Sequence, residues 1–314
     1  MRIIGFLIFL LCITSCSHAQ PEIELKNKRL MILGDSITNS GLYASYIDYY
    51  LQKRFPKDKF DIISIGLSSE TASGLSEKDH PFPRPCIHER LERALDMIKP
   101  DVVSACYGMN DGIYHPQSPE RMKAYQDGIT KLVNLCQSKG AKFVILNSPP
   151  PYDPIPKAKS LRKEGAPDYS YKYPFYKYHE VLEDYAKWLN STKMKNVLVN
   201  DFNTMMTNYT KEKRKTDPKF LFSKDGIHPG PLGHLMMAQT VLKGLGMKFG
   251  PLEEEFATIN KDPMWKLVSQ RRKLRSQGWL KYVGYTRGKT FKIDSIEATK
   301  AKAVELQNQI DKLK

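Results

Sequence analysis

Three residues have the types needed for nucleophilic catalysis. Ser36 lies in the segment GDSIT (34–38), and Asp225 and His228 lie in DGIHP (225–229), late in the chain. A serine hydroxyl becomes a good nucleophile when a nearby base takes its proton, and the base needs a carboxylate to fix its tautomer. Only two residues separate Asp225 from His228, so one short loop can deliver both the carboxylate and the base.

Two further residues can stabilise the charge that such an attack creates. Acyl transfer through a tetrahedral intermediate requires hydrogen-bond donors aimed at the oxyanion. Gly66 has no Cβ, so a substrate can approach its backbone N–H, and Asn110 offers a side-chain amide. With the Ser36 N–H they make three donors. Each motif alone also fits an ordinary turn or helix cap, but their joint occurrence favours the catalytic interpretation.

The elements that must position these residues alternate along the chain. Short apolar runs predict strands at residues 30–33, 60–65, 102–106, 143–146 and 197–199. Longer patterns predict helices near 42–54, 87–98, 118–138, 175–190 and 232–243. This alternation predicts a parallel sheet with helices on both faces, whose ligand lies beyond the carboxyl ends of the strands. The motifs follow the first three strands or precede the last helix, so they are expected to converge on one edge.

These motifs resemble the signature of a known family, the SGNH hydrolases, also called the GDSL esterases. The resemblance covers about residues 29 to 245 and implies a flavodoxin-like three-layer α/β/α sandwich with a central five-stranded parallel sheet. It also implies acyl-ester hydrolysis without a metal or other cofactor. The family's signature residues, and its Asp three positions before the His, match Ser36, Gly66, Asn110, His228 and Asp225. The Gly-x-Ser-x-Gly elbow of the α/β-hydrolases is absent around Ser36, which disfavours that superfamily.

Charged residues near these motifs are candidate substrate contacts. The segments GLSSET (66–71), FPRP (82–85) and HER (88–90) resemble an exported bacterial subgroup of the family. The candidates are Arg84, His88 and Arg90, with Asp35 beside the nucleophile. The alternative is a helix start with ordinary exposed charges.

A proline-rich loop follows the fourth predicted strand, from Pro149 to about Pro174. Its sequence is unsuited to a helix or a sheet interior. Seven aromatic residues lie from Tyr152 to Tyr178, counting these two. A tyrosine-rich rim can stack on sugar rings, but packing of the loop onto its own domain is the commoner use and is favoured.

The N-terminus has the form of an export signal over residues 1–19: a positive start, an apolar run too short to span a membrane, and small residues at the cut. The segment ITSC (13–16) resembles a lipobox and predicts cleavage before a lipidated Cys16, whereas Ala19 suits an ordinary signal peptidase. We favour a periplasmic or outer-membrane lipoprotein, with a secreted protein as the alternative. Cys86, Cys106 and Cys136 remain, without metal-ligand spacing or a disulfide framework.

The C-terminal residues 246–314 are predicted to form a basic, mostly helical extension. Residues 260–314 carry 14 Lys+Arg and 5 Asp+Glu, which is most of the net charge of +15. The run RRKLR (271–275) invites a nucleic-acid or anionic-surface interpretation, but export and the lack of a binding motif favour a solvated helix face and no nucleic-acid partner. The apolar spacing from Ile296 predicts a helix that packs on its own domain rather than a coiled coil.

The composition, 41% hydrophobic over 314 residues, supports a folded core and excludes a disordered chain. The leading hypothesis is a serine esterase that removes a short acyl group, with acetyl favoured, from a carbohydrate. Export, the tyrosine-rich rim and the absence of a long apolar lid favour this substrate. The alternatives are a lipid or phospholipid esterase, a noncatalytic carbohydrate-binding lipoprotein, and a tail that binds anionic polymers or lipid head groups.

Overall fold

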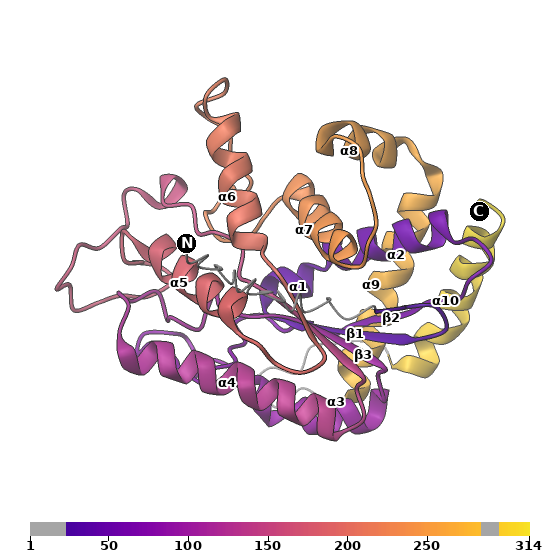
Figure 1. Cartoon of the computed structure of the whole chain (residues 1–314), viewed down its shortest axis with the longest axis horizontal. Helices are drawn as coiled ribbons and strands as arrows, with labels where there is room; N and C mark the ends of the chain where they lie inside the picture. Colours follow the sequence, from indigo (N-terminus) through magenta and orange to yellow (C-terminus); the bar gives the residue numbers. More distant parts are fainter. Residues whose placement is uncertain (1–22, 284–294) are drawn as a thin grey trace, which may run out of the picture.

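Five parallel strands form the central sheet of the computed structural model, which describes residues 23–283 and 295–314. The strands run in the order β2-β1-β3-β4-β5, and Figure 1 shows the sheet between two layers of helices. Their bounds are β1 Arg29–Gly34, β2 Asp61–Ser64, β3 Val102–Cys106, β4 Phe143–Asn147 and β5 Val197–Asn200. The predicted α/β/α sandwich with a five-stranded parallel sheet is confirmed.

Helices cover both faces of the sheet, as its apolar strands require. One layer contains α2 (Leu42–Arg54), α7 (Pro231–Gly244) and α9 (Pro263–Val283). The other contains α3 (Leu91–Ile98), α4 (Pro119–Ser138) and α5 (Tyr178–Ser191), and Figure 1 shows α3 and α4 side by side below the sheet. The rings of Tyr125 and Tyr185 stack at 4.1 Å and join α4 to α5. Met31, Ile32 and Leu33 of β1 are fully buried between the layers.

Three helices not predicted individually complete the catalytic edge and its surroundings. They are α1 (Ser36–Ser40), α6 (Phe202–Lys213) and α8 (Leu252–Lys261). Asp35 caps α1 by accepting the Ile37 N–H, and Gly41 ends it in the left-handed conformation. The α6 segment is rich in Thr and Asn, which have low helix propensity, so its sequence signal is weak. Asp201 nevertheless caps it through the Thr204 N–H.

The basic run of the C-terminal extension is not a solvated face, so this prediction is wrong for its first two arginines. Arg271 and Arg272 lie on α9, are each 5% exposed, and face α2 and α1. Arg271 Nη2 donates to Asp48 Oδ2 at 2.5 Å. Arg272 donates to the Ser45 hydroxyl and the Ser40 carbonyl, both at 2.9 Å. Both guanidinium groups are therefore buried and hydrogen-bonded to acceptors on distant segments of the chain. An anionic polymer cannot reach them.

The last helix, α10 (Ile296–Asp311), packs along α9, and Figure 1 shows the two side by side. Leu306 and Ile310 are buried in this contact. The predicted packing of this apolar spacing on its own chain is confirmed. The helical extension thus joins the layer of α2 and α7.

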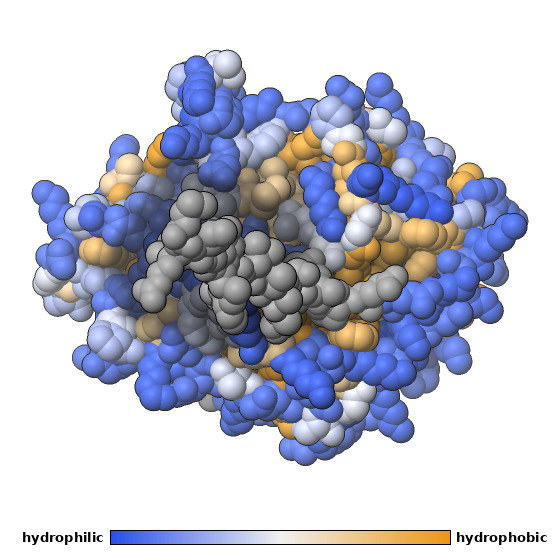
Figure 2. All heavy atoms as spheres, in the orientation of Figure 1, coloured by the Kyte–Doolittle hydropathy of each residue, from blue (hydrophilic) through white to orange (hydrophobic). Residues whose placement is uncertain are grey.

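Polar and charged residues cover most of the face in Figure 2, with apolar residues gathered around the ends of α2 and α7. A hollow there is lined mainly by Leu51, Phe55, Phe60, Leu242 and Met247. Its other lining residues precede β1 and β2 or lie at the C-terminal end of α7, so the hollow lies at the amino ends of the strands. In the part of the chain that the structure describes, no helix combines the length and apolarity needed to span a bilayer. The predicted export signal and Cys16 lie outside the described residues.

We expect Arg271→Met to lower the free energy of unfolding by about 3–5 kcal/mol, because it leaves a buried carboxylate without its cation. Asp48 is 1% exposed. Urea unfolding measures the change. Lys273→Met, at an exposed position of the same helix, is the control and should change the free energy by less than about 0.5 kcal/mol. Equal, small changes in both variants would contradict the structural role of Arg271.

Candidate active site

The four sequence motifs meet at the carboxyl edge of the sheet. Ser36 begins α1 directly after β1, Gly66 follows β2, and Asn110 follows β3. The loop before α7 carries Asp225 and His228. The Leu67 N–H donates to the Gly34 carbonyl at 2.8 Å, which continues the pairing of β1 with β2 past the strand ends. The parallel register thus brings together residues far apart in the sequence.

Ser36, His228 and Asp225 form a continuous line of hydrogen bonds. Ser36 Oγ lies 2.7 Å from His228 Nε2, and His228 Nδ1 lies 2.7 Å from Asp225 Oδ2. Because a carboxylate only accepts, Nδ1 carries the ring proton in the neutral histidine. Nε2 is then the acceptor and the Ser36 hydroxyl the donor, which is the arrangement that lets a histidine remove a serine proton.

The second oxygen of Asp225 is held by the loop itself. Oδ1 accepts from the Ser223 hydroxyl and from the N–H groups of Ile227 and His228, at 2.8 to 2.9 Å. Partial burial acts to raise the pKa of Asp225, but its hydrogen bonds outweigh burial and hold the pKa well below its usual range. The hydrogen bond to Asp225 raises the pKa of His228 above 6.5, against the opposing effect of burial. The pair is therefore built to stabilise an imidazolium.

Gly66 occupies a position where no larger residue fits. A Cβ on Gly66 would lie 2.5 Å from Asn39 N and from the carbonyl carbon of Thr38. Its carbonyl accepts from Asn39 Nδ2 at 2.8 Å, which ties the loop after β2 to α1. The close approach fixes the Gly66 backbone beside the helix that carries Ser36.

Asn110 is 4% exposed, and both ends of its amide have protein partners. Oδ1 accepts from the Tyr114 hydroxyl, and Nδ2 donates to the Glu70 carbonyl, both at 3.3 Å. Since an amide nitrogen carries two hydrogens, one remains to donate to a ligand. The arrangement fits the predicted oxyanion donor.

A pocket of about 390 Å³ opens on these groups. Its lining combines polar and aromatic side chains from the loops after β2 and β3 and from the tyrosine-rich loop. It is lined by Ser36, Ser68, Ser69, His80, Pro81, Phe82, Arg84, Asn110, Tyr114, Tyr171, Ile227 and His228. Tyr171 belongs to the tyrosine-rich loop noted in the sequence, whereas Ser69, His80 and Tyr114 were not singled out, because no local motif distinguishes them.

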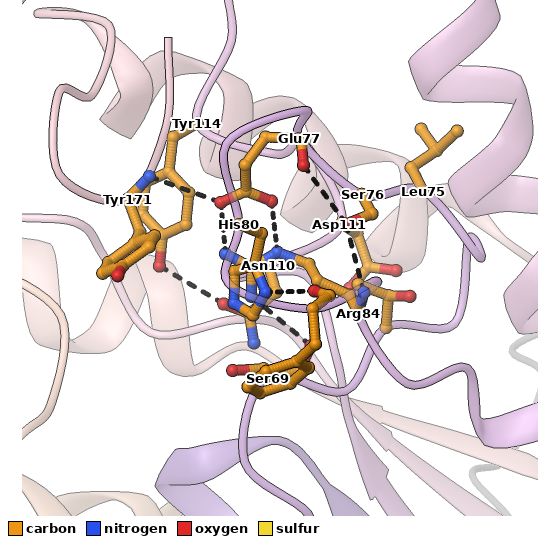
Figure 3. A network of polar contacts seen from close by, with 12 residues as sticks. Ser69, Leu75, Ser76, Glu77, His80, Arg84, Asn110, Asp111, Tyr114 and Tyr171 are labelled. Atoms are coloured by element: carbon orange, nitrogen blue, oxygen red, sulfur yellow. Dashed lines mark hydrogen bonds and ion pairs between the residues drawn. The ribbon is translucent and has the colours of Figure 1, made fainter. Parts of the chain in front are cut away.

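Arg84 belongs to the wall of this pocket but is 3% exposed. Its Nε and Nη2 donate to the two carboxylate oxygens of Glu77, at 2.5 and 2.6 Å, and its Nη1 donates to the Ser69 carbonyl at 3.4 Å. Figure 3 shows this network beside Asn110 and Tyr114. Arg84 thus stiffens the pocket wall, and its contact with substrate stays a prediction.

The other three candidate substrate contacts also have partners within the fold, and their contact with substrate stays a prediction. His88 Nε2 bonds to the Gly128 carbonyl of α4 at 3.1 Å. Arg90 donates to both oxygens of the buried Glu70 at 2.7 Å. Asp35 is 2% exposed and caps α1, and burial raises its pKa to about 7. Each side chain is directed to a partner within the fold, and the pocket lining includes none of them.

The aromatic residues of the long loop mostly pack inward, as the favoured interpretation predicts. Tyr152, Phe175 and Tyr178 are buried, whereas Tyr173 and Tyr176 are exposed and Tyr171 lines the pocket. Within residues 23–283 and 295–314, the structure has no group of three His, Cys, Asp or Glu side chains that is suited to hold a metal ion.

Comparison with known proteins agrees with this geometry. Residues 32–236 match the GDSL-like lipase/acylhydrolase family. The chain belongs to this family of hydrolases. No curated protein matches the chain.

Solved structures give a second comparison for this GDSL-like chain. A gut microbial diltiazem-metabolizing enzyme superposes with a TM-score of 0.54 at 22% identity, and the match covers 72% of this chain but only 48% of that one. A carbohydrate acetylesterase family member from Sinorhizobium meliloti gives a TM-score of 0.45 at 17% identity, covering 70% of this chain and 100% of that one. The first likeness shows a shared fold.

The pKa of His228 sets the expected pH dependence of this hydrolase. Histidine acts as a base only when neutral, so kcat/KM should fall as the pH drops through the raised pKa of His228. Asp225→Asn removes the charge that favours the imidazolium, so the acid limb should move to lower pH. We expect kcat to fall by on the order of 10⁴.

Initial rates on nitrophenyl acetate across pH measure both effects. Ser223→Ala is the control, because it removes one hydrogen bond to Asp225 and keeps the charge. An acid limb that stays in place in Asp225→Asn would show that Asp225 does not raise the pKa of His228.

Asn110→Ala tests the oxyanion donor in the same assay. Loss of one such donor should lower kcat by about 10² to 10³ and leave KM nearly unchanged. A change confined to KM would instead make Asn110 a substrate-binding residue.

Proposed function

We propose that the protein is a serine esterase that removes short acyl groups, acetyl above all, from carbohydrates. The observation that carries this proposal is the line Ser36–His228–Asp225, with both hydrogen bonds at 2.7 Å, opening on the same pocket as Asn110. Such a line is not needed for binding alone, which disfavours the noncatalytic alternative.

In the proposed first step, Ser36 Oγ attacks the ester carbonyl carbon while His228 Nε2 takes the hydroxyl proton. Asp225 stabilises the resulting imidazolium through Nδ1–H. The oxyanion accepts hydrogen bonds from Ser36 N–H, Gly66 N–H and Asn110 Nδ2–H. These donors are fixed before the reaction, so no reorganisation is needed as charge develops.

In the second step, His228 donates its proton to the leaving alcohol oxygen as the carbon–oxygen bond breaks, and the acyl group remains on Ser36. A water molecule then attacks the acyl-enzyme by the same route, with His228 again as the base. The products are the free acid and the regenerated serine. Every proton moves between Ser36, His228 and the substrate or water.

The pocket supports a small, hydroxyl-rich substrate. Its volume of about 390 Å³ lies near the lower end of the range of small-molecule sites. Ser69, His80 and Arg84 give its wall a polar character, and Tyr114 and Tyr171 supply aromatic rings. Aromatic faces and polar groups together match the apolar and hydroxyl-bearing parts of a sugar.

A lipid or phospholipid esterase is the second candidate, because a more apolar groove lies on the other side of the base. It has a volume of about 590 Å³ and includes Asp225 and His228 in its lining, with Leu221, Phe222, Leu232 and Phe256 as its apolar residues. A long acyl chain would be expected to lie there. Acyl-chain preference therefore separates the two candidates.

The proposed substrate also fits the proposed location. The N-terminal segment 1–19 leads us to propose export, with Cys16 as the lipidated first residue of a periplasmic or outer-membrane protein, or alternatively secretion. An exported esterase meets polysaccharides, and a lipid anchor would hold it near them.

Hydrolysis of nitrophenyl esters from acetate to dodecanoate, with acetate release from acetylated glycans, tests the proposal. We expect the highest kcat/KM on the acetyl ester and loss of all turnover in Ser36→Ala, which should keep the wild-type unfolding temperature. Rising activity with chain length, reversed by Phe256→Ala, would support the lipid esterase. Turnover that survives in Ser36→Ala would refute the assigned nucleophile.

A further inference from the structure

The side-chain amide of Asn110 can serve as an oxyanion donor in only one of its two orientations. The oxygen and nitrogen ends of an amide have nearly the same shape, so packing alone does not select between them. If Oδ1 faced the substrate, a partial negative charge would oppose the oxyanion. Something in the fold must therefore fix the amide.

We propose that Tyr114 is the positioning residue that fixes the amide of Asn110 with its nitrogen toward the oxyanion. The Tyr114 hydroxyl donates to Asn110 Oδ1 at 3.3 Å, an oxygen that can only accept. The inference rests on the proposed function, because it assigns a purpose to the orientation of a proposed oxyanion donor. Tyr114 acts through Asn110 rather than on the reacting atoms.

The backbone that carries Tyr114 is held in an unusual conformation. Ile113 and Tyr114 have φ angles of 45° and 61°, two consecutive non-glycine residues in the left-handed region. This region is unfavourable for ordinary side chains and especially for a β-branched isoleucine. Such strain persists where surrounding contacts impose it, and it concentrates at functional sites. Here it turns the chain so that Tyr114 reaches back to Asn110.

Contacts on either side of the turn impose this conformation. Asp111, next to Asn110, accepts the N–H groups of Ala72 and Ser73 at 2.7 Å. The carbonyl of Tyr114 accepts the Phe175 N–H at 2.9 Å. The turn is therefore tied both to the loop after β2 and to the tyrosine-rich loop.

The ring of Tyr114 is held as firmly as its backbone. It stacks on Tyr178 with a centroid distance of 4.8 Å and an interplanar angle of 26°. The guanidinium carbon of Arg84 lies 5.6 Å from its centroid, and Glu77 fixes that guanidinium, as Figure 3 shows. Burial raises the pKa of Tyr114 well above its usual value, so the hydroxyl remains a donor throughout the working pH range.

The nitrogen end of the amide has an equally fixed partner. Asn110 Nδ2 donates to the Glu70 carbonyl, and the Glu70 side chain is held by Arg90 at 2.7 Å and by the Tyr107 hydroxyl at 2.7 Å. One hydrogen of Nδ2 is thereby bonded to the Glu70 carbonyl. The other is left to donate to the oxyanion. Because the Glu70 carbonyl can only accept, it requires the nitrogen end of the amide, and the Tyr114 hydroxyl then donates to Oδ1 and holds that orientation.

Tyr114→Phe removes only the hydroxyl and keeps the ring in its stack. Loss of one hydrogen bond corresponds to roughly a 2- to 10-fold change, so we expect kcat on nitrophenyl acetate to fall by about 5-fold with KM unchanged. Tyr125→Phe is the matched control: its hydroxyl is equally buried and donates to the Tyr107 carbonyl at 3.1 Å, away from the amide. It should lose stability and keep kcat. Equal kcat in wild type and Tyr114→Phe would overturn the proposal.

A double-mutant cycle with Asn110→Ala tests whether Tyr114 acts through the amide. In the Asn110→Ala background, Tyr114→Phe should no longer change kcat, whereas a further 5-fold loss would overturn the proposal by showing an independent effect. Phosphorylation of Ser36 by diethyl p-nitrophenyl phosphate gives a second readout for the slow variants: the serine oxygen bonds to phosphorus, p-nitrophenolate leaves, and the serine proton passes to His228. The rate of this phosphorylation should fall in Tyr114→Phe but should not fall further when Tyr114→Phe is added to Asn110→Ala.

The outcomes separate this inference from the proposed function. If Ser36→Ala retains turnover, or if the wild-type protein is phosphorylated elsewhere than at Ser36, the proposed chemistry itself fails. If Ser36→Ala is inactive but Tyr114→Phe matches wild type in both assays at equal unfolding temperature, only the positioning role of Tyr114 fails.

Discussion

The parallel register of the first three strands is the constraint on which the site depends. Gly34 of β1 pairs with Cys106 of β3, and Ile32 pairs with Ser64 of β2. The strands therefore end together, and the residues that follow them emerge at one edge of the sheet. Because side chains alternate between faces, a slip of one residue would turn an entire strand over and separate these groups.

Buried ion pairs form the next level of organisation. Glu77 pairs with Arg84 and Glu70 with Arg90, so the loop after β2 is fixed at two points beside the pocket. Arg271 of α9 pairs with Asp48 of α2. Buried pairs add little net stability because both charges lose their water, but their geometric demands favour one arrangement of the chain over others. In this protein they hold loops and helices that the sheet alone does not order.

The sequence was sufficient for the sheet and the motifs because their signals are local. The apolar runs of β1 and β3 and the segment DGIHP are readable within a few residues. The arginines were misjudged because their partners are distant: Arg271 and Asp48 are 223 residues apart. From sequence alone an arginine is predicted to be exposed, because the carboxylate that pairs with it in the fold cannot be identified. The role of Tyr114 depends on a φ angle of 61°, which the sequence of an Ile-Tyr pair does not suggest.

Asp35 shows how the helix that carries the nucleophile reconciles two opposing demands. The first N–H groups of a helix have no partner within it, and Asp35 accepts that of Ile37, while the Ser36 N–H is the proposed oxyanion donor. A carboxylate at this end of α1 stabilises the helix, yet its charge would repel a neighbouring oxyanion. Burial raises the pKa of Asp35 to about 7, so near neutral pH it is neutral more often than an ordinary aspartate. The cap is therefore kept at a reduced average charge where the oxyanion would form.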